Sequence, residues 1–414
     1  MPRALLVVLD GCGDRPVKEL GGKTPLEVAV KPTMDRLASE GSCGLMDVIS
    51  PGIRPGSDTA HLAIFGYDPY RYYPGRGPLE ALGAGLDLKP GDVAFRTNVA
   101  TVNSDFVVLD RRGGRYIDPS EAREIEKIIN NEVLQPLKVK YGIEGVYKQT
   151  VEHRGVLVLR GNVSPAVTDT DPHRVGARVE EARALREEAR LTSEFINEFT
   201  RLVYEKLGGA KFNELRRREN KPVINMVLLR GAGTFKELEP LSVRYRVKPA
   251  IIAGVALIRG IGRAVGMEPI DVKGYVGSKD DDFTAAFMEA ARQLGSHDFV
   301  FLHVKPTDSM SHDGDFRGKV MIIERVDAGL RAFLERAPSD TYVFITCDHA
   351  TPITVREHTG DPVPFMAWGP DVMRDDVTRF SERDCAKGYW SRIRGLDVMN
   401  IIANYLGTLE KFGE

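Results

Sequence analysis

The sequence predicts an α/β protein whose main sheet is mostly parallel and flanked by helices. Two short apolar runs rich in valine, phenylalanine and isoleucine, Phe299–Val304 and Tyr342–Thr346, have the length and composition of buried strands. The stretch between them, Phe316–Leu334, has the apolar spacing of a helix. A strand, a helix and a second strand in this order indicate a βαβ unit, in which the two strands run parallel.

The length of the chain, 414 residues, exceeds the usual size of a single domain. A segment dense in glycine, proline and tyrosine, Tyr67–Gly85, is typical of a crossing between domains. The block that follows has strands and helices of its own, so we interpret it as an inserted α/β domain. The expected boundaries are residues 1–70 and 248–414 for a discontinuous main domain and 71–247 for the insertion.

Composition excludes several classes of protein. A formal net charge of -2 argues against a protein that mainly grips nucleic acid. No segment approaches the ~20 apolar residues of a membrane span, and the apolar start runs into Asp10, which does not fit a signal peptide. Four scattered cysteines without a CxxC spacing suit a reducing compartment, so we expect a cytoplasmic protein. Abundant arginine and glutamate with scarce glutamine are typical of thermophilic proteins.

The N-terminal elements follow from local patterns. Arg3–Leu9 is an apolar run with the character of a strand, and polar residues follow at its carboxyl end. Pro32 suits the first turn of a helix, and Gly41 suits its C-terminal cap. Residues 44–49 have the pattern of the next strand, and a helix-like apolar run follows Ser57. Ligands of open α/β sheets bind beyond the carboxyl ends of strands, so the polar residues there are site candidates.

The remaining elements are predicted from periodicity and from glycine and proline breaks. In the middle block, strands are expected at residues 92–109, 155–159 and 223–229, and helices at residues 120–134 and 175–207. In the last third, helices are expected at residues 250–266, 283–294 and 395–406, and strands at residues 269–272 and 364–368. The middle block therefore resembles a domain in its own right rather than a linker.

Aspartates and histidines gather after the two strands of the βαβ unit. Four of the chain's eight histidines lie between residues 298 and 358. The candidate residues are Asp308, His312, Asp348, His349 and His358. Taken singly, each is an ordinary capping or turn residue. Taken together, carboxylates and imidazoles at strand ends are costly to bring together without a cation, so they predict a metal site with nitrogen and oxygen ligands.

Two earlier residues suit the same site. Asp10 follows the first predicted strand, just as Asp348 follows a later one, although a plain strand-to-loop turn is the alternative. Ser57 follows a glycine at the start of a helix-like run, where its hydroxyl would serve as an N-cap. Beside a two-metal site we interpret Ser57 instead as a nucleophile, because a helix N-terminus stabilises a phosphorylated side chain and a metal can hold the hydroxyl as an alkoxide.

Motifs distributed over nearly the whole chain carry a resemblance to a known family. They are LDGCGDRP, GKTPLE, PGSDTAHLAIFGYDP, GRGPLEALGAG, TDTDPH, AGVALIRGIGR, TDxxxHDGD and CDHATP. With these motifs the sequence resembles the alkaline phosphatase superfamily and, more narrowly, the archaeal type of cofactor-independent (2,3-bisphosphoglycerate-independent) phosphoglycerate mutase. The resemblance implies an alkaline-phosphatase-like fold and an isomerase of glycolysis and gluconeogenesis that interconverts 3-phosphoglycerate and 2-phosphoglycerate.

The resemblance also implies two divalent metal ions, no 2,3-bisphosphoglycerate, and a phosphoserine intermediate at Ser57. One ion is assigned to Asp308, His312 and His358, and the other to Asp10, Asp348, His349 and Ser57. Manganese is the expected metal, with zinc, cobalt and magnesium as alternatives, because a nitrogen and oxygen ligand set admits several ions. One departure is Ser311, where the family pattern leads us to expect glycine; it removes no ligand.

A substrate that carries a carboxylate and a phosphate needs cations, and arginine binds both groups with paired hydrogen bonds. The predicted substrate-binding residues are Lys305, Arg154, Arg160, Asp169, Asp171 and Arg230. Lys305 precedes the metal-binding stretch, the arginines lie at strand edges of the middle block, and either aspartate could serve as a base for the glycerate hydroxyls. For each of these residues a surface ion pair is the alternative interpretation.

Two other functions compete with the mutase interpretation. The same site would suit a metal-dependent phosphatase, phosphodiesterase or phosphopentomutase, although hydrolysis does not require the large middle block. A non-catalytic scaffold that binds metal or phosphate is the alternative from a different class. The expected partner is a small molecule, and neither nucleic acid nor a membrane is expected; the sequence does not indicate the oligomeric state.

Overall fold

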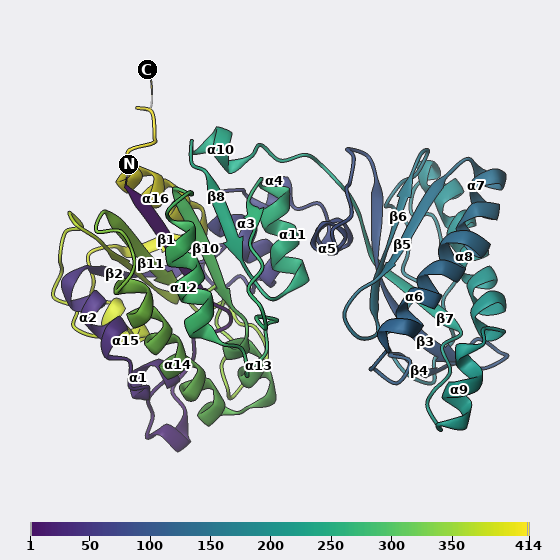
Figure 1. Cartoon of the computed structure of the whole chain (residues 1–414), viewed down its shortest axis with the longest axis horizontal. Coiled ribbons are helices and arrows are strands. Elements are labelled where there is room, and N and C mark those ends of the chain that lie inside the picture. The colour runs from purple at the N-terminus through teal and green to yellow at the C-terminus, as the bar shows by residue number, and fades with distance from the viewer. Residues whose placement is uncertain (1, 412, 414) are drawn as a thin grey trace. The chain divides into compact units, whose positions relative to one another are not determined.

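The computed structural model describes residues 2–411 and 413, which form two compact units (Figure 1). The first unit consists of Met1–Tyr73 and Leu238–Glu414, and the second unit consists of Pro74–Glu237. The first unit is therefore built from two separate stretches of the chain. None of the helices in the described part of the chain is long and apolar enough to cross a lipid bilayer.

The described part of the first unit contains an eight-stranded sheet with the order β13-β2-β12-β11-β1-β10-β8-β9. Its strands are β1 (Arg3–Leu9), β2 (Ser42–Asp47), β8 (Pro249–Ile252), β9 (Glu268–Pro269), β10 (Phe299–Val304), β11 (Thr341–Thr346), β12 (Val363–Trp368) and β13 (Ser391–Arg394). The central strands β11, β1, β10 and β8 are parallel, whereas β12 is antiparallel to both of its neighbours. The predicted α/β class with a mostly parallel sheet is confirmed.

Helices flank this sheet (Figure 1). They are α1 (Pro25–Val28), α2 (Pro32–Glu40), α3 (Ser57–Ile64), α4 (Pro69–Tyr72), α10 (Leu241–Arg244), α11 (Ala256–Ala264), α12 (Phe283–Gln293), α13 (Pro306–Asp313), α14 (Phe316–Leu334), α15 (Glu382–Cys385) and α16 (Val398–Leu406), with short 3₁₀ turns η1 (Lys18–Leu20) and η4 (Gly395–Asp397). Helix α14 packs against α12 and α2, while α11 packs against α3. Every residue of β10 and β11 is buried, as expected for parallel strands that are covered on both faces.

The predicted βαβ unit is present with one addition. Strands β10 and β11 are parallel, but β1 lies between them and pairs with both, so that Ala4 is in register with Phe299 on one side and Tyr342 on the other. Three neighbouring parallel strands therefore end at one edge of the sheet. The residues that follow them, starting with Asp10 after β1, are brought together there although hundreds of residues separate them.

The prediction of one helix over residues 250–266 is wrong. Strand β8 occupies its first part and pairs with β10, and helix α11 begins at Ala256. Residues 250–253 are an apolar run that is fully buried. A short buried run has no periodicity that separates a strand from a helix, so pairing with a neighbouring strand decides the outcome.

The second unit has a five-stranded sheet in its described residues, with the order β4-β3-β6-β5 and with β7 also paired to β3. The strands are β3 (Val93–Val102), β4 (Val108–Asp110), β5 (Glu144–Gln149), β6 (Arg154–Arg160) and β7 (Met226–Thr234), and all pairings are antiparallel. The helices are α5 (Arg76–Gly83), α6 (Pro119–Ile128), α7 (Gln135–Tyr141), α8 (Arg190–Gly208) and α9 (Phe212–Arg218), with the π turn η2 (Ile129–Leu134) between α6 and α7 and the 3₁₀ turn η3 (Glu187–Ala189) before α8. One apolar cluster that includes Phe195, Phe199 and Leu157 forms its main core.

The prediction of a long helix over residues 175–207 is half wrong. Helix α8 begins only at Arg190, and the residues before it form turns, isolated bridges and the 3₁₀ turn η3. Gly176 has a φ of 82°, which no helix tolerates, and Arg178 and Ala184 form antiparallel bridges with residues outside the segment. These backbone bonds to neighbouring strands replace the helical ones, and an alanine- and glutamate-rich sequence does not reveal them.

Candidate metal centre

The candidate site lies at the carboxyl edge of the first sheet. Asp10 follows β1, Asp348 and His349 follow β11, and Lys305 follows β10. Ser57 is the first residue of α3, and the loop after β11 returns to the same place at His358. The structure therefore brings together residues from five separate segments of the chain.

Asp308 and His312 lie on α13, a helix that was not predicted from the sequence. They are four residues apart and therefore share one face of the helix. The Nε2 atom of His312 lies 3.4 Å from Oδ1 of Asp308. Pro306 opens the helix and Gly314 closes it in the left-handed conformation, with a φ of 74°.

Two overlapping groups of side chains have the spacing of metal ligands. Asp10, Asp348 and His349 form one group, and Asp308, His349 and His358 form the other, with ligand atoms within 4.8 Å of one another in each. The Nε2 atom of His349 lies 3.2 Å from Asp348 Oδ2, 3.4 Å from Asp10 Oδ1 and 3.1 Å from Ser57 Oγ. His349 thus lies where the two predicted ligand sets meet, and the rings of His349 and His358 stack with centroids 3.6 Å apart.

Two buried carboxylate oxygens in this place have no hydrogen-bond partner among the described residues: Oδ1 of Asp10 and Oδ2 of Asp348. Both side chains are almost completely buried, with exposed fractions of 1% and 0%. An unpaired buried carboxylate oxygen is expensive, and a divalent cation among these ligands removes the cost. The residues present therefore fit a metal ion.

The orientation of two imidazoles agrees with this fit. His312 donates from Nδ1 to the carbonyl of Arg356 over 2.8 Å, and His358 donates from Nδ1 to the carbonyl of Pro55 over 2.9 Å. A carbonyl can only accept a hydrogen bond, so Nδ1 carries the proton in both rings. The Nε2 atom of each ring is then the one available to a metal, and the backbone holds it in that orientation.

His349 is oriented by a side chain instead. The hydroxyl of Thr351 donates to Asp308 Oδ1 over 2.9 Å, so it accepts from Nδ1 of His349, 3.0 Å away. Nε2 of His349 consequently carries no proton in the neutral ring, and it can accept a hydrogen bond from the Ser57 hydroxyl. The carboxylate oxygens of Asp348 and Asp10 beside it have no proton to donate, so a cation or an added proton makes these two contacts favourable.

The charges of the site are strongly coupled. Burial opposes ionisation of Asp308, but the hydrogen bond from His312 and the ammonium of Lys305 hold the pKa of its carboxyl far below the usual range. The same hydrogen bond raises the pKa of His312 to about 9. Burial disfavours the charged form of Lys305 as well, yet Asp10 and Asp308 raise its pKa, and its Nζ donates to both carboxylates. Lys305 is therefore a permanent cation beside the ligands.

Several supporting residues were not assigned a role from the sequence. His303 on β10 lies with Nε2 3.0 Å from Asp10 Oδ2, and Thr307 donates to the carbonyl of Asp10. His61 lies one helical turn after Ser57, and its Nδ1 is 2.6 Å from the carbonyl of that residue. Burial lowers the pKa of His61 to about 4, so its ring is neutral. The sequence feature that could have identified His61 is its spacing of four residues from Ser57. This spacing places the two residues on one face only if the segment is a helix.

The predicted substrate-binding residues of the second unit divide into two places. A cavity of about 320 Å³ is lined by six arginines and three other polar residues, namely Arg96, Asn98, Arg111, Arg112, Arg115, Glu152, His153, Arg154 and Arg230. Asp171 accepts a bidentate pair of hydrogen bonds from Arg111, and Asp169 accepts from the backbone N–H of Gly231. Arg160 does not line this cavity, because its guanidinium forms a bidentate pair with Asp92.

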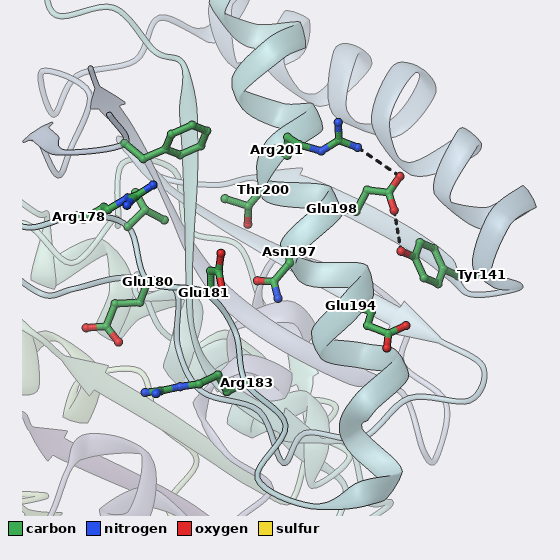
Figure 2. A pocket seen from close by; sticks show the side chains of 12 residues that line it. Tyr141, Arg178, Glu180, Glu181, Arg183, Glu194, Asn197, Glu198, Thr200 and Arg201 are labelled. Atoms are coloured by element: carbon green, nitrogen blue, oxygen red, sulfur yellow. Dashed lines mark hydrogen bonds and ion pairs between the residues drawn. The ribbon is translucent and has the colours of Figure 1, made fainter. Parts of the chain in front are cut away.

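A larger cavity of about 990 Å³ in the second unit lies along α8 (Figure 2). Four glutamates line it, and Glu198 binds both Arg201 and the hydroxyl of Tyr141. Three arginines line the cavity as well, but they do not outnumber the four glutamates, so the lining has no net attraction for phosphate and carboxylate groups. The smaller cavity, with its excess of arginine, is the better match for an anionic ligand despite its size.

Comparisons with known proteins agree with the geometry. Residues 38–213 match the family model described as 2,3-bisphosphoglycerate-independent phosphoglycerate mutase. Proteins of that name from Pyrobaculum islandicum and Methanopyrus kandleri are 56% and 46% identical, over 100% and 99% of this chain and 100% and 98% of theirs. The solved structure of the PH0037 protein from Pyrococcus horikoshii is 38% identical with a TM-score of 0.85, covering 100% of this chain and 99% of the other.

A second solved structure carries a functional name. The cofactor-independent phosphoglycerate mutase from Thermoplasma acidophilum is 34% identical, with a TM-score of 0.73 over 98% of this chain and 99% of the other. Relatives with this level of identity over their full length share one family, and the motifs predicted the same one. The chain belongs to the 2,3-bisphosphoglycerate-independent phosphoglycerate mutase family.

Proposed function

We propose that the protein interconverts 3-phosphoglycerate and 2-phosphoglycerate, with Ser57 carrying the phosphoryl group between the two hydroxyls of glycerate. The observation that supports this most directly is the position of the Ser57 hydroxyl. It lies 3.1 Å from Nε2 of His349, at the first turn of α3 and beside the unpaired carboxylate oxygens of the metal centre. Family membership supports the same reaction.

Two divalent ions are assigned to the centre. Asp308, His312 and His358 would hold one, and Asp10, Asp348, His349 and Ser57 would hold the other. When bound, the ions supply positive charge at the attacking and leaving oxygens of the phosphoryl transfer. Manganese is proposed as the native metal, with zinc, cobalt and magnesium as alternatives for this ligand set.

In the proposed reaction, Ser57 is the protein group that accepts the phosphoryl group and returns it. In the first half-reaction the bond between Ser57 Oγ and phosphorus forms, the bond from phosphorus to the 3-oxygen of the substrate breaks, and the hydroxyl proton ends on that oxygen. Glycerate then presents its 2-hydroxyl, which takes the phosphoryl group while its proton returns to Ser57. The N-terminal N–H groups and dipole of α3 stabilise the phosphoserine between the two steps.

Lys305 has a positioning role in this scheme. Its ammonium donates to Asp10 and to Asp308, one carboxylate from each predicted ligand set. It therefore keeps the two carboxylates at a constant separation, and its charge favours an incoming phosphate. Because the lysine is held by both carboxylates, it remains protonated at neutral pH.

Substrate binding is assigned to the second unit, through Arg154 and Arg230. Both line the arginine-rich cavity, and a cluster of guanidinium groups fits the carboxylate and phosphate of phosphoglycerate. Asp171 and Asp169 are proposed to serve the glycerate hydroxyls during re-orientation. Substrate binding by Arg160 stays a prediction, because its guanidinium already donates to the carboxylate of Asp92. Water must be excluded while the phosphoserine exists, since hydrolysis would turn the enzyme into a phosphatase.

The proposal is tested by supplying 3-phosphoglycerate without 2,3-bisphosphoglycerate and coupling the appearance of 2-phosphoglycerate to enolase. Mutase activity with a phosphorylated Ser57 peptide trapped during turnover is the expected result. Ser57→Ala should lower turnover by at least about 1000-fold, because the covalent step is lost, while metal binding is largely retained. Release of free phosphate in place of 2-phosphoglycerate would favour the phosphatase alternative, and unchanged behaviour of Ser57→Ala would favour the scaffold.

A further inference from the structure

The four cysteines of the chain, scattered in sequence, form two pairs in the fold. All four are buried with an exposed fraction of 0%, and all belong to the first unit. Cys12 is paired with Cys347, and Cys43 is paired with Cys385. Chance contact would not be expected to place every cysteine of a 414-residue chain against another one.

The first pair lies at the carboxyl edge of the sheet. Cys347 directly follows β11, which pairs with β1 up to the register of Val8 with Thr346. Cys12 lies just after β1, in a turn closed by the hydrogen bond from its N–H to the carbonyl of Leu9. The turn returns the chain to the end of β11: Cys12 forms an isolated antiparallel bridge with Ala350, and its side chain lies beside that of Cys347.

The second pair lies at the other side of the sheet, between β2 and α15, which pack against each other. Cys43 is on β2, and Cys385 is the last residue of α15. The segment after α15 folds back on Cys43, whose carbonyl accepts from the N–H of Trp390 over 3.0 Å. The side chains of Cys43 and Cys385 lie beside each other in this place.

Each pair joins the two sequence segments of the discontinuous first unit. Cys12 and Cys43 belong to the segment before the second unit, and Cys347 and Cys385 belong to the segment after it. A covalent bond in either place would enclose the whole of the second unit in one loop. A cross-link across so long a loop removes much conformational freedom from the unfolded chain, so it gives a large stabilisation in the chain-entropy model.

We propose that both pairs close as disulfides, Cys12–Cys347 and Cys43–Cys385, and that these bonds hold together the two segments of the first unit. Each bond forms by thiol–disulfide exchange with a small-molecule disulfide: two protein thiols lose two protons and two electrons, one S–S bond forms, and the oxidant leaves as two thiols. Intracellular proteins of hyperthermophiles are a known exception to the absence of disulfides in the cytosol, and the composition of this chain is of thermophilic type.

The environment of the thiols indicates when the bonds form. All four thiols are buried in the folded protein, so none of them meets a reagent in solution. The exchange therefore takes place during folding, while the thiols still meet solvent. The same burial shields the finished bonds from reductants.

The test is a thiol map of the full-length protein refolded with oxidised glutathione. The protein is denatured without reductant, treated with iodoacetamide and digested. The expected result is no alkylated cysteine and two cross-linked peptides that join Cys12 to Cys347 and Cys43 to Cys385. Alkylation of all four cysteines, or cross-links between other partners, would overturn the proposal.

Stability provides a second measurement. Protein refolded in the presence of reductant should have a Tm at least about 10 °C below that of protein refolded with oxidised glutathione, because two long-range cross-links are absent. The double variant Cys43→Ala with Cys385→Ala, which lies away from the metal centre, should lose about half of this reductant-dependent shift. A Tm that is the same with and without reductant would contradict the role of the bonds, even where the thiol map shows them.

Discussion

Lys319 on α14 is a buried cation beneath the metal-binding loops. Its ammonium donates to Asp14 Oδ2 over 2.8 Å and to the carbonyls of Gly11 and Thr351 over 3.0 and 3.2 Å. Its side chain and that of Asp14 are completely buried. The ammonium therefore ties the loop after β1 to the loop after β11, on which the predicted ligands lie.

Lys319→Met is expected to destabilise the protein by about 3–5 kcal/mol, because it leaves the carboxylate of Asp14 buried without its cation. Urea unfolding of the metal-free protein measures this directly. Lys387→Met is the matched control: Lys387 is 77% exposed in its side chain and 3.9 Å from Asp384, so its loss should cost less than about 0.5 kcal/mol. Equal effects of the two substitutions would contradict the assignment.

His153 makes stability depend on pH. Burial, assisted by the charge of Arg154, lowers the pKa of its imidazole to about 4. In the unfolded chain the pKa is ~6.5, so between these values the unfolded state binds a proton that the folded state does not. The contribution of His153 to the free energy of unfolding is therefore fully present above pH ~6.5 and is lost as the pH falls towards 4.

The effect of His153 is isolated by His153→Gln. Urea unfolding at pH 7.5 and at pH 4.5 should show a loss of stability for the wild type that exceeds the loss for the variant by on the order of 2 kcal/mol. The difference between the two proteins removes contributions from all other titrating groups. A variant that loses as much stability as the wild type would show that the imidazole does not control this range.

At the level of elements, α13 is the most informative segment. This helix, to which the sequence analysis assigned no element, presents Asp308 and His312 on one face. Ser311 lies inside it, with its hydroxyl donating to the carbonyl of Thr307 over 2.9 Å. Ser311, the residue that departs from the family pattern, therefore occupies a buried position in a helix rather than in a turn. Serine there supports the helix without contributing a ligand atom.

Ser311→Gly should lower the free energy of unfolding by about 0.5–1 kcal/mol, because glycine in a helix interior loses more conformational freedom on folding. The metal content of the variant should be unchanged, since every ligand atom remains. Ser39→Gly in α2 is the matched control, because its hydroxyl makes the same kind of bond to the carbonyl of Arg36. Loss of bound metal in Ser311→Gly alone would show that the residue influences the centre itself.

For several elements, the local sequence pattern is sufficient to predict the conformation. Strands β1, β10 and β11 follow from short apolar runs that are buried on both faces, and helix α14 follows from its long helical spacing. Residues 250–253 and 175–189 were assigned to helices because their patterns are compatible with more than one conformation. Contacts with distant strands decide those segments, and no local pattern contains those contacts.

At the scale of the whole molecule, metal binding is coupled to the stability of the folded state. The predicted ligands come from both sequence segments of the first unit, so an ion bound among Asp10, Asp348 and His349 joins segments that are far apart in the chain. Any ligand that binds only the folded state stabilises it according to its affinity and concentration. Metal binding should therefore raise Tm as well as activity.

Removal of metal is expected to abolish mutase activity and to lower Tm by several degrees, which corresponds to about 3 kcal/mol for an ion at 100 times its Kd. Calorimetry before and after treatment with a chelator, followed by addition of Mn²⁺, Co²⁺, Zn²⁺ or Mg²⁺, measures both effects. Activity should return without 2,3-bisphosphoglycerate. Full activity in a protein shown to be metal-free would contradict the proposed centre.

The sequence alone determined the fold class, the ends of the central strands, the residue types of the site and, through its motifs, the family. These are local properties, since periodicity and the residues that follow a strand are read within one short segment. Tertiary structure decided which carboxylate meets which imidazole, which ring nitrogen is protonated, and that Lys319 and two pairs of cysteines bridge distant segments. Such contacts depend on the order and register of strands that are hundreds of residues apart in the sequence. In this protein the position of β1 between β10 and β11 brings the loops of the site together.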